Sequence, residues 1–303
     1  MSVFDRFDPL TKEYLTELRS KGILHFEEDP VVDVFKMREN VYSIYSRSPG
    51  AGGDAWMHLV IGPEKAMLID TGFGIGDLKA LVEKLTDQPY YVVNTHFHGD
   101  HSQGNYQFEE VYCQKYDVEG LMAQMNPEVR ERFQPKEDSY YSAADVVPYK
   151  EYKVIGVEDG YVFDLGQGHT IELIHLPGHA PGGCGFIDPV NRILFSGDAV
   201  VSTPVLICGD ASSNPHSEFM TVAAFGTQLE KLTAKLDQFD VLYPGHAILE
   251  YPKSSVTDML QACREVVADP DSFTEINSTG RIEEAKLKIV GLASFAYTDD
   301  RVR

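Results

Sequence analysis

Two periods of apolar residues run along this chain, and they divide it into expected helices and strands. Apolar residues three and four positions apart predict helices over residues 10–22, 76–85, 118–125, 127–133, 220–236, 254–267 and 282–293. Short apolar or alternating runs predict strands over residues 41–45, 56–61, 66–69, 90–94, 152–155, 161–163, 170–174, 192–195 and 241–243. The repeated order of strand, helix and strand indicates a layered α/β architecture.

We interpret these elements as one domain over residues 1–303, because no repeat, low-complexity tract or linker separates them. Residues 107–150 are rich in charge and tyrosine and predict a helical insertion. Residues 254–303 predict a C-terminal helical extension. The glycine-rich loop over residues 47–54 fits a flap over a site as well as it fits an ordinary hairpin loop.

Composition and charge narrow the classes of partner. Hydrophobic residues make up 43% of the chain, which is enough for a sizeable core and excludes global disorder. The formal net charge is −21. A field of that sign repels phosphate backbones and anionic lipids, so we expect no nucleic acid and no membrane as partner, and a small molecule as substrate. The oligomeric state does not follow from the sequence.

The cysteines and the first residues indicate a cellular compartment. Four cysteines lie far apart, with no C-x-x-C pair, which predicts free thiols rather than disulfides or a cysteine zinc site. The N-terminus carries acidic residues where a signal peptide needs a basic start. No apolar run approaches the roughly 18 residues of a spanning helix. We therefore expect a cytoplasmic protein.

One short run concentrates side chains that bind metals. His96, His98, Asp100 and His101 directly follow the expected strand 90–94. Imidazoles and a carboxylate are ligands suited to Zn²⁺, Fe or Mn²⁺. Crowding them on one turn is costly unless a cation compensates for the lost solvation. A solvated histidine-rich turn is the alternative reading of this run taken alone.

Three further segments repeat the arrangement of an apolar strand followed by a ligand-type side chain. His179, Asp198 and His246 each follow such a strand, and Asp70 follows the strand 66–69. Loops that follow strands can present their side chains at one edge of a sheet, so we expect these residues to form one site.

Four of the other histidines are expected to lie in the core or at the surface rather than in the site. His58 and His175 lie inside apolar strands, and we expect them to be hydrogen-bonded core residues. His169 and His216 lie in turn-like stretches, and we expect them to face solvent.

This set of motifs, in this order, resembles the metallo-β-lactamase fold superfamily over residues 66–246. The resemblance implies an α/β fold, a four-layer αββα sandwich, with a two-metal site at one edge. It implies that His96, His98 and His179 bind one metal, that Asp100, His101 and His246 bind the other, and that Asp198 bridges both. It also implies that Asp70 orients a ligand from behind.

The resemblance and the ligand chemistry together predict a binuclear zinc-dependent hydrolase. Two Zn²⁺ ions are expected, although the donors also suit Fe or Mn. The expected reaction is attack of a metal-bridging hydroxide on a small-molecule ester, thioester or lactone, with catalytic roles for Asp100 and Asp198. Relatives that reduce oxygen carry a glutamate at the position of His98, so this histidine favours hydrolysis.

Two alternatives remain open at this point. The same site suits a β-lactam or phosphodiester hydrolase, although an acidic chain makes a poor nuclease. A mononuclear iron persulfide dioxygenase, using only His96, His179 and Asp198, is the rival from another enzyme class.

Overall fold

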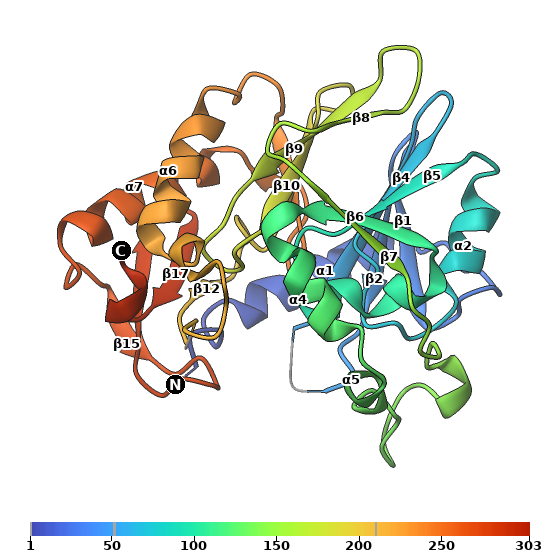
Figure 1. Ribbon diagram of the computed structural model, residues 1–303, viewed down its shortest axis with the longest axis horizontal. Coiled ribbons are helices and arrows are strands. Elements are labelled where there is room, and N and C mark those ends of the chain that lie inside the picture. Colours follow the sequence, from blue (N-terminus) through green and yellow to red (C-terminus); the bar gives the residue numbers. More distant parts are fainter. Residues whose placement is uncertain (1, 51–52, 210) are drawn as a thin grey trace. The chain divides into compact units, whose positions relative to one another are not determined.

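The computed structural model describes residues 2–50, 53–209 and 211–303, and the chain divides into two compact units (Figure 1). The first unit comprises residues 19–171, and the second comprises residues 2–18 and 172–303. Two residues of the loop 47–54, Ala51 and Gly52, lie outside the described residues, so the interpretation of that loop as a flap lies outside them too.

The first unit is built on a seven-stranded sheet whose strands follow one another in chain order. The first four strands pair antiparallel and the last four pair in parallel. The strands are β1 (Val32–Arg38), β2 (Val41–Ser46), β3 (Ala55–Ile61), β4 (Ala66–Ile69), β5 (Tyr90–Val93), β6 (Glu110–Gln114) and β7 (Lys153–Val157). The predicted turn between β3 and β4 is confirmed, since the Gly62 amide donates to the Lys65 carbonyl at 2.9 Å.

Helices connect the parallel strands of this unit. They are α2 (Leu78–Leu85), α3 (Gly99–Ser102), α4 (Val118–Gln124) and α5 (Pro127–Glu131), with short 3-10 turns at η1 (Gln103–Gln107), η2 (Lys115–Asp117) and η3 (Ala143–Asp145). The α2 helix begins at Asp77, whose carboxylate accepts from the Ala80 amide at 3.0 Å. It buries Leu78, Leu81 and Val82 among apolar side chains of the sheet.

The interpretation of residues 107–150 as a helical insertion is only partly right. Residues 110–114 form β6, a strand of the main sheet that pairs in parallel with β5 and β7. The buried positions of β6 include Val111 and Cys113, whose alternation with more exposed residues is a strand period. After η1 ends at residue 107, the next helical turn begins only at residue 115.

The second unit contains most of a larger sheet, together with a smaller sheet and helices. The larger sheet has the order β14 (Tyr251–Pro252), β13 (Val241–Pro244), β11 (Ile193–Gly197), β10 (Cys184–Asp188), β9 (Thr170–His175) and β8 (Val162–Asp164). Its strand β8 and the first two residues of β9 belong to the range 19–171, so the boundary between the units falls inside β9. The smaller sheet has the order β12 (Val205–Ile207), β17 (Ala293–Tyr297), β16 (Ala285–Val290) and β15 (Glu275–Asn277). The helices are α1 (Asp8–Lys21), which starts in this unit, α6 (Val222–Thr233) and α7 (Ser254–Ala268), with 3-10 turns at η4 (Ser217–Phe219) and η5 (Asp299–Arg301).

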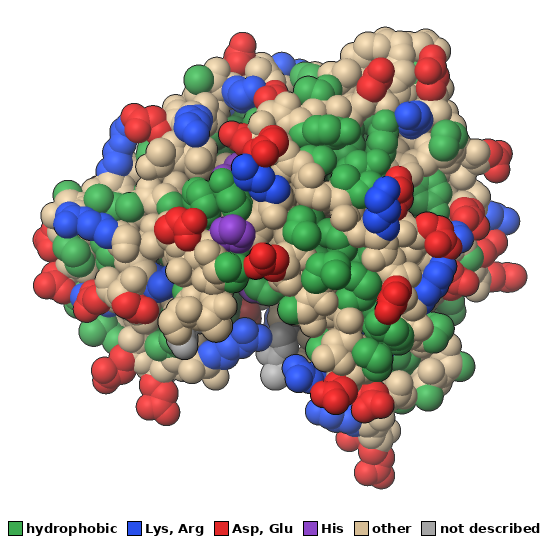
Figure 2. Space-filling view, viewed as in Figure 1, with side chains coloured by type: hydrophobic (Ala, Val, Ile, Leu, Met, Phe, Trp, Pro, Cys, Tyr) green, Lys and Arg blue, Asp and Glu red, His purple; other side chains and the backbone are tan. Residues whose placement is uncertain are grey.

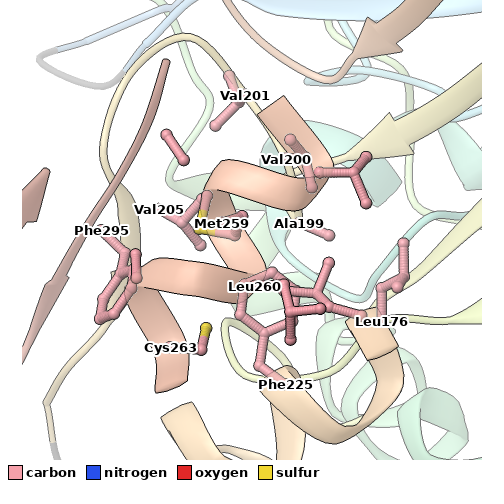
Figure 3. Packing of buried hydrophobic residues seen from close by; sticks show 14 of the residues in the cluster. Leu176, Ala199, Val200, Val201, Val205, Phe225, Met259, Leu260, Cys263 and Phe295 are labelled. Carbon is pink, nitrogen blue, oxygen red and sulfur yellow. The ribbon is translucent and has the colours of Figure 1, made fainter. Parts of the chain in front are cut away.

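The core of the second unit lies where α6 and α7 meet the two sheets (Figure 1). Figure 3 shows Met259 and Cys263 of α7 within one apolar cluster with Phe225 of α6 and Phe295 of β17. The loop after β11 joins the same cluster through Val200. Burial of this apolar surface therefore anchors the chain directly beyond the end of β11.

The predicted helix over residues 282–293 is wrong, and so is the interpretation of 254–303 as helical throughout. The α7 helix is the only α-helix there, and β15, β16, β17 and the short 3-10 turn η5 follow it. In β16, Ala285 and Leu287 are buried while Lys286 between them is more exposed, which is a period of two. Gly291, with a φ of 53°, begins the two-residue hairpin loop to β17.

The structure also tests the other assignments from the sequence. His58 and His175 are buried and hydrogen-bonded as predicted, to Ser43 Oγ at 2.9 Å and to the Pro181 carbonyl at 2.8 Å. The expectation that His169 faces solvent is wrong, because the turn over residues 166–168 ends there and His169 is already buried beside the start of β9.

The expectations about disulfides and membrane-spanning helices can also be compared with the structure. All four cysteines are free thiols, as predicted. Among the described residues, none of the helices has both the length and the apolar character needed to cross a membrane.

A buried carboxylate in the first unit makes the stability of the protein depend on pH. Asp29 is 1% exposed, and within the described residues its two oxygens make no hydrogen bond of ordinary geometry. Burial raises the pKa of Asp29 to about 7; the Val31 amide opposes this shift, and the Asp77 and Asp145 carboxylates add to it.

We predict that Asp29→Asn stabilises the protein at neutral and alkaline pH. The folded state penalises the ionised carboxylate, so the native chain loses stability as the pH rises from about 4, the ordinary pKa, to about 7. The variant should gain on the order of 3–4 kcal/mol in unfolding free energy at pH 8 and little at pH 4. Denaturant titrations at both pH values measure this, with the exposed Asp87→Asn as control. A gain that does not depend on pH would contradict the account.

Candidate functional site

In the first unit, two neighbouring parallel strands bring candidate residues to one edge of the sheet. β4 and β5 pair in parallel, with Ile69 opposite Val93. Asp70 follows β4, and the run containing His96, His98, Asp100 and His101 follows β5 after two residues. Both loops therefore leave the same edge, as the sequence predicts for this unit.

The Asp70 carboxylate is the centre of the hydrogen bonds in these two loops. It accepts from the Thr95 amide at 2.7 Å and from the Thr95 hydroxyl at 2.8 Å. The same carboxylate lies 2.9 Å from Nδ1 of His101. Asp70 has a φ of 63°, a backbone conformation that is uncommon for residues other than glycine. The backbone at Asp70 is therefore locally strained, and the three hydrogen bonds of its carboxylate stabilise this conformation.

These hydrogen bonds decide which nitrogen of each imidazole carries a proton. An ionised carboxylate only accepts, so Nδ1 of His101 donates to Asp70 and the neutral ring keeps its lone pair on Nε2. The Thr95 hydroxyl uses its proton on Asp70, so it accepts from Nδ1 of His96 at 3.1 Å. The lone pair of neutral His96 is then also on Nε2.

The other two residues of the run lie beside these oriented rings. Nδ1 of His98 lies 3.1 Å from Nε2 of His96, and Oδ2 of Asp100 lies 3.6 Å from Nε2 of His101. The Phe97 amide donates to the Asp117 carboxylate at 2.9 Å, just before α4 begins. The segment after β6 therefore holds the middle of the run in place.

In the second unit, three strands that run in one direction carry the remaining candidates. β11 and β13 pair in parallel, and β9 has the direction of β11 because both pair antiparallel with β10. His179, Asp198 and His246 follow β9, β11 and β13 in turn. They therefore gather beyond one end of this sheet, as predicted.

Asp198 lies between the two histidines of this group. Its Oδ2 is 3.5 Å from Nε2 of His179 and 3.3 Å from Nε2 of His246. Nδ1 of His179 lies 2.8 Å from the Leu206 carbonyl of β12, which can only accept. Nδ1 of His179 therefore carries a proton, and the lone pair of the neutral ring points to Asp198.

The donor atoms suit a metal ion. Nε2 of neutral His101 and of neutral His179 each bear a lone pair that faces a carboxylate oxygen at 3.5–3.6 Å. Two lone pairs at this distance repel each other unless a proton or a cation lies between them. Nitrogen and carboxylate donors together suit Zn²⁺, and backbone or carboxylate partners behind ligating imidazoles are usual in zinc sites. All seven candidate residues belong to groups of side chains that could hold a metal ion.

Some residues of the site were not identified from the sequence. Thr95 links Asp70 to His96, and its position between a strand and a histidine is a signal that sequence reasoning could have used. The Leu206 carbonyl orients His179, but a backbone group leaves no trace in the sequence.

A buried arginine supports the loop that follows Asp70. Arg130 of α5 is 4% exposed and donates to the carbonyls of Phe73, Gly74 and Val147, at 2.9 Å for Phe73 and 2.7 Å for Val147. It also donates to Oε1 of Gln103, two residues beyond His101, at 3.3 Å. Burial lowers the pKa of Arg130 to about 10. Sequence reasoning missed it, because an isolated arginine carries no motif.

The chain is similar in sequence to several hydrolases. It is 29% identical over 235 residues to the human acyl-coenzyme A thioesterase MBLAC2, covering 69% of this chain and 78% of that protein. It is 29% identical over 126 residues to the probable polyketide biosynthesis zinc-dependent hydrolase BaeB of Bacillus velezensis, covering 41% of this chain and 52% of the relative.

Solved structures show the same fold at lower identity. A metallo-β-lactamase family protein of Thermus thermophilus aligns with a TM-score of 0.55 and 20% identity, covering 77% of this chain and 82% of that one. The DIM-1 metallo-β-lactamase aligns with a TM-score of 0.53 and 18% identity, covering 79% and 100%. These likenesses confirm the predicted α/β fold class, the metallo-β-lactamase fold.

The family match covers all of the ligand-bearing segments. The model of the metallo-beta-lactamase superfamily matches residues 50–273, which is more than half of the chain. That range includes Asp70 and every candidate ligand from His96 to His246. The chain is a hydrolase, and it belongs to the metallo-β-lactamase superfamily.

Proposed function

We propose that the protein is a binuclear zinc-dependent hydrolase of small-molecule thioesters. The observation that carries the proposal is the position of Asp198, whose Oδ2 faces Nε2 of two histidines from different strand ends. A carboxylate approached by two imidazoles suits a ligand shared between two metal ions. The choice of thioesters over esters and lactones rests on the sequence similarity to proteins named as thioesterases.

In this proposal the seven candidates divide into two ligand sets that share one residue. His96, His98 and His179 bind the first ion, Asp100, His101 and His246 bind the second, and Asp198 binds both. Each ion then has four protein ligands, which leaves room for water and a substrate oxygen. The hydrogen bonds of Asp70 and of the Leu206 carbonyl support metal binding by both sets, since they leave Nε2 of His101 and of His179 able to bind a cation.

The chain's own residues then prepare the site for acyl transfer to water. Bound zinc would supply an acidified water and would polarise the substrate carbonyl. Asp70 fixes the rings of His101 and His96, so the ligand atoms need no reorientation during the reaction. We assign proton transfer to Asp100. Its Oδ2 faces Nε2 of His101, and its side chain is 29% exposed.

The leaving group supports thioesters as substrates. A thiol has an ordinary pKa of about 8.5, so a thiolate departs readily without prior protonation. An amide nitrogen needs a proton before it leaves, and Asp100 is the sole residue to which we assign proton transfer. A site of this composition therefore suits activated acyl bonds better than amide bonds.

We also propose that the protein acts in the cytoplasm on a small molecule, without nucleic acid or membrane as partner. Four free thiols and a net charge of −21 support this. On the face drawn in Figure 2, Lys and Arg side chains are interspersed with Asp and Glu and form no continuous basic tract.

The substrate class is tested by comparing kcat/KM values of the zinc-loaded enzyme. The panel contains an acyl-coenzyme A thioester, a simple ester, a lactone, a β-lactam and a phosphodiester. We expect the highest kcat/KM for the thioester, because a thiolate is a good leaving group. The similarity to a protein named as an acyl-coenzyme A thioesterase supports the same expectation. A β-lactam or a phosphodiester turned over faster than every acyl ester and thioester would overturn the proposal.

The binuclear site is tested by metal content and by Asp198→Ala. Wild-type protein should hold close to two zinc ions per chain. The variant loses a ligand of both ions, so kcat should fall by several orders of magnitude and zinc content should fall, while the melting temperature of the metal-free protein changes little. The exposed Asp237→Ala, in the same unit, is the control. Near-normal turnover and two bound zinc ions in Asp198→Ala would show that the residue is misassigned.

The orienting role of Asp70 is tested by Asp70→Asn. Asparagine keeps the shape of the side chain and tolerates a positive φ, but it removes the charge that fixes His101 and Thr95. We expect zinc affinity to fall by about 10–100-fold, as for other partners behind metal ligands. Competition with a chromophoric chelator measures this directly. A zinc affinity within twofold of the wild type would mean that the hydrogen bonds of Asp70 do not orient the histidine ligands for metal binding.

A further inference from the structure

The C-terminal end of the chain places a buried guanidinium beside the loop that carries His179. Arg301, in η5, is 3% exposed although it is the third residue from the C-terminus. Its Nη2 donates to the Gly178 carbonyl at 3.3 Å and its Nη1 donates to the Gly209 carbonyl at 2.9 Å. Its Nε donates to the Met220 carbonyl. One side chain therefore joins three backbone segments of the second unit.

Each of these segments bears on the position of His179. Gly178 immediately precedes His179. Gly209 follows β12, the strand whose Leu206 carbonyl lies 2.8 Å from Nδ1 of His179. Met220 lies between η4 and α6, two residues before α6 begins, and a Cβ on Gly178 would approach the Cβ of Phe225 in α6 to 3.0 Å. The loop thus lies against α6 and β12, and Arg301 donates to a backbone carbonyl two residues outside each of these elements.

The backbone around Arg301 is itself fixed to the core. The Val302 carbonyl accepts from the Ala223 amide in the first turn of α6 at 3.0 Å, and the Val302 side chain belongs to the apolar cluster of this unit. A buried charge is costly unless its donors are satisfied, and planar guanidinium donors can serve several carbonyls at once. The buried guanidinium of Arg301 is therefore satisfied by backbone carbonyls, and its hydrogen bonds fix the backbone next to the candidate ligand His179.

We propose that Arg301 is a positioning residue for His179, holding the Gly178–His179 backbone so that Nε2 of His179 is aligned to bind metal. This inference rests on the proposed function, in which His179 is a ligand of the first ion. It assigns to the C-terminal segment a role in metal binding besides its contribution to the core. Arg301 itself touches neither metal nor substrate in this proposal.

The test compares zinc affinity, measured by chelator competition, in wild type, Arg301→Met, Arg301→Lys and Arg303→Met. Arg303 is a matched control, since it lies two residues away, is exposed and donates to a single carbonyl, that of Val267. We expect Arg301→Met to bind one of its two zinc ions at least tenfold more weakly than the wild type, at a temperature where both are folded. Arg301→Lys should recover part of the affinity, and Arg303→Met should match the wild type.

The outcomes separate the two proposals. Wild-type protein that binds no zinc, or only one ion, overturns the binuclear function. Two tightly bound ions in wild type and in Arg301→Met, with only the melting temperature lowered, overturn the positioning role alone. If Arg301→Met does not fold, Arg301→Lys decides, because an ammonium donates from one nitrogen and cannot reproduce the three-carbonyl geometry. Wild-type affinity in Arg301→Lys would then overturn the inference.

Discussion

The arrangement on which the rest of the site depends is a set of imidazole nitrogens turned towards carboxylate oxygens. His101 faces Asp100 in the first unit, and His179 faces Asp198 in the second, with Nδ1 of each ring engaged elsewhere. Such a pair is unfavourable when both groups present lone pairs, and it becomes favourable when a cation binds them. The fold holds the pair in this geometry, so the affinity for a metal is built into the folded chain rather than acquired by rearrangement.

That geometry is maintained by partners behind the ligands. In the first unit Asp70 fixes two rings, one directly and one through Thr95, and buried Arg130 fixes the loop beyond Asp70. In the second unit the Leu206 carbonyl fixes His179. These partners come from strand ends and from segments outside the ligand loops. The precision of a metal site therefore depends on much more of the chain than its ligands.

The ligand-bearing segments could be predicted because they combine a local period with a local motif. A buried run followed by a turn and then by a histidine or aspartate places a strand and a candidate ligand in one short window. The C-terminal region could not be predicted this way. Apolar and polar side chains alternate only over residues 285–289, and the hairpin loop after β16 depends on the positive φ of Gly291. Arg130 donates to a carbonyl that is distant in the sequence, that of Phe73, and no local sequence pattern predicts such a contact.

The central claim is that Asp198 binds two zinc ions, one with each ligand set. Anomalous diffraction at the zinc absorption edge, from crystals of the zinc-loaded protein, tests it most directly. The account predicts two anomalous peaks about 3.5–4 Å apart, each within about 2.2 Å of an Asp198 oxygen. One peak should lie beside Nε2 of His179 and the other beside Nε2 of His246. A single peak, or two peaks of which one lies away from Asp198, would contradict the account.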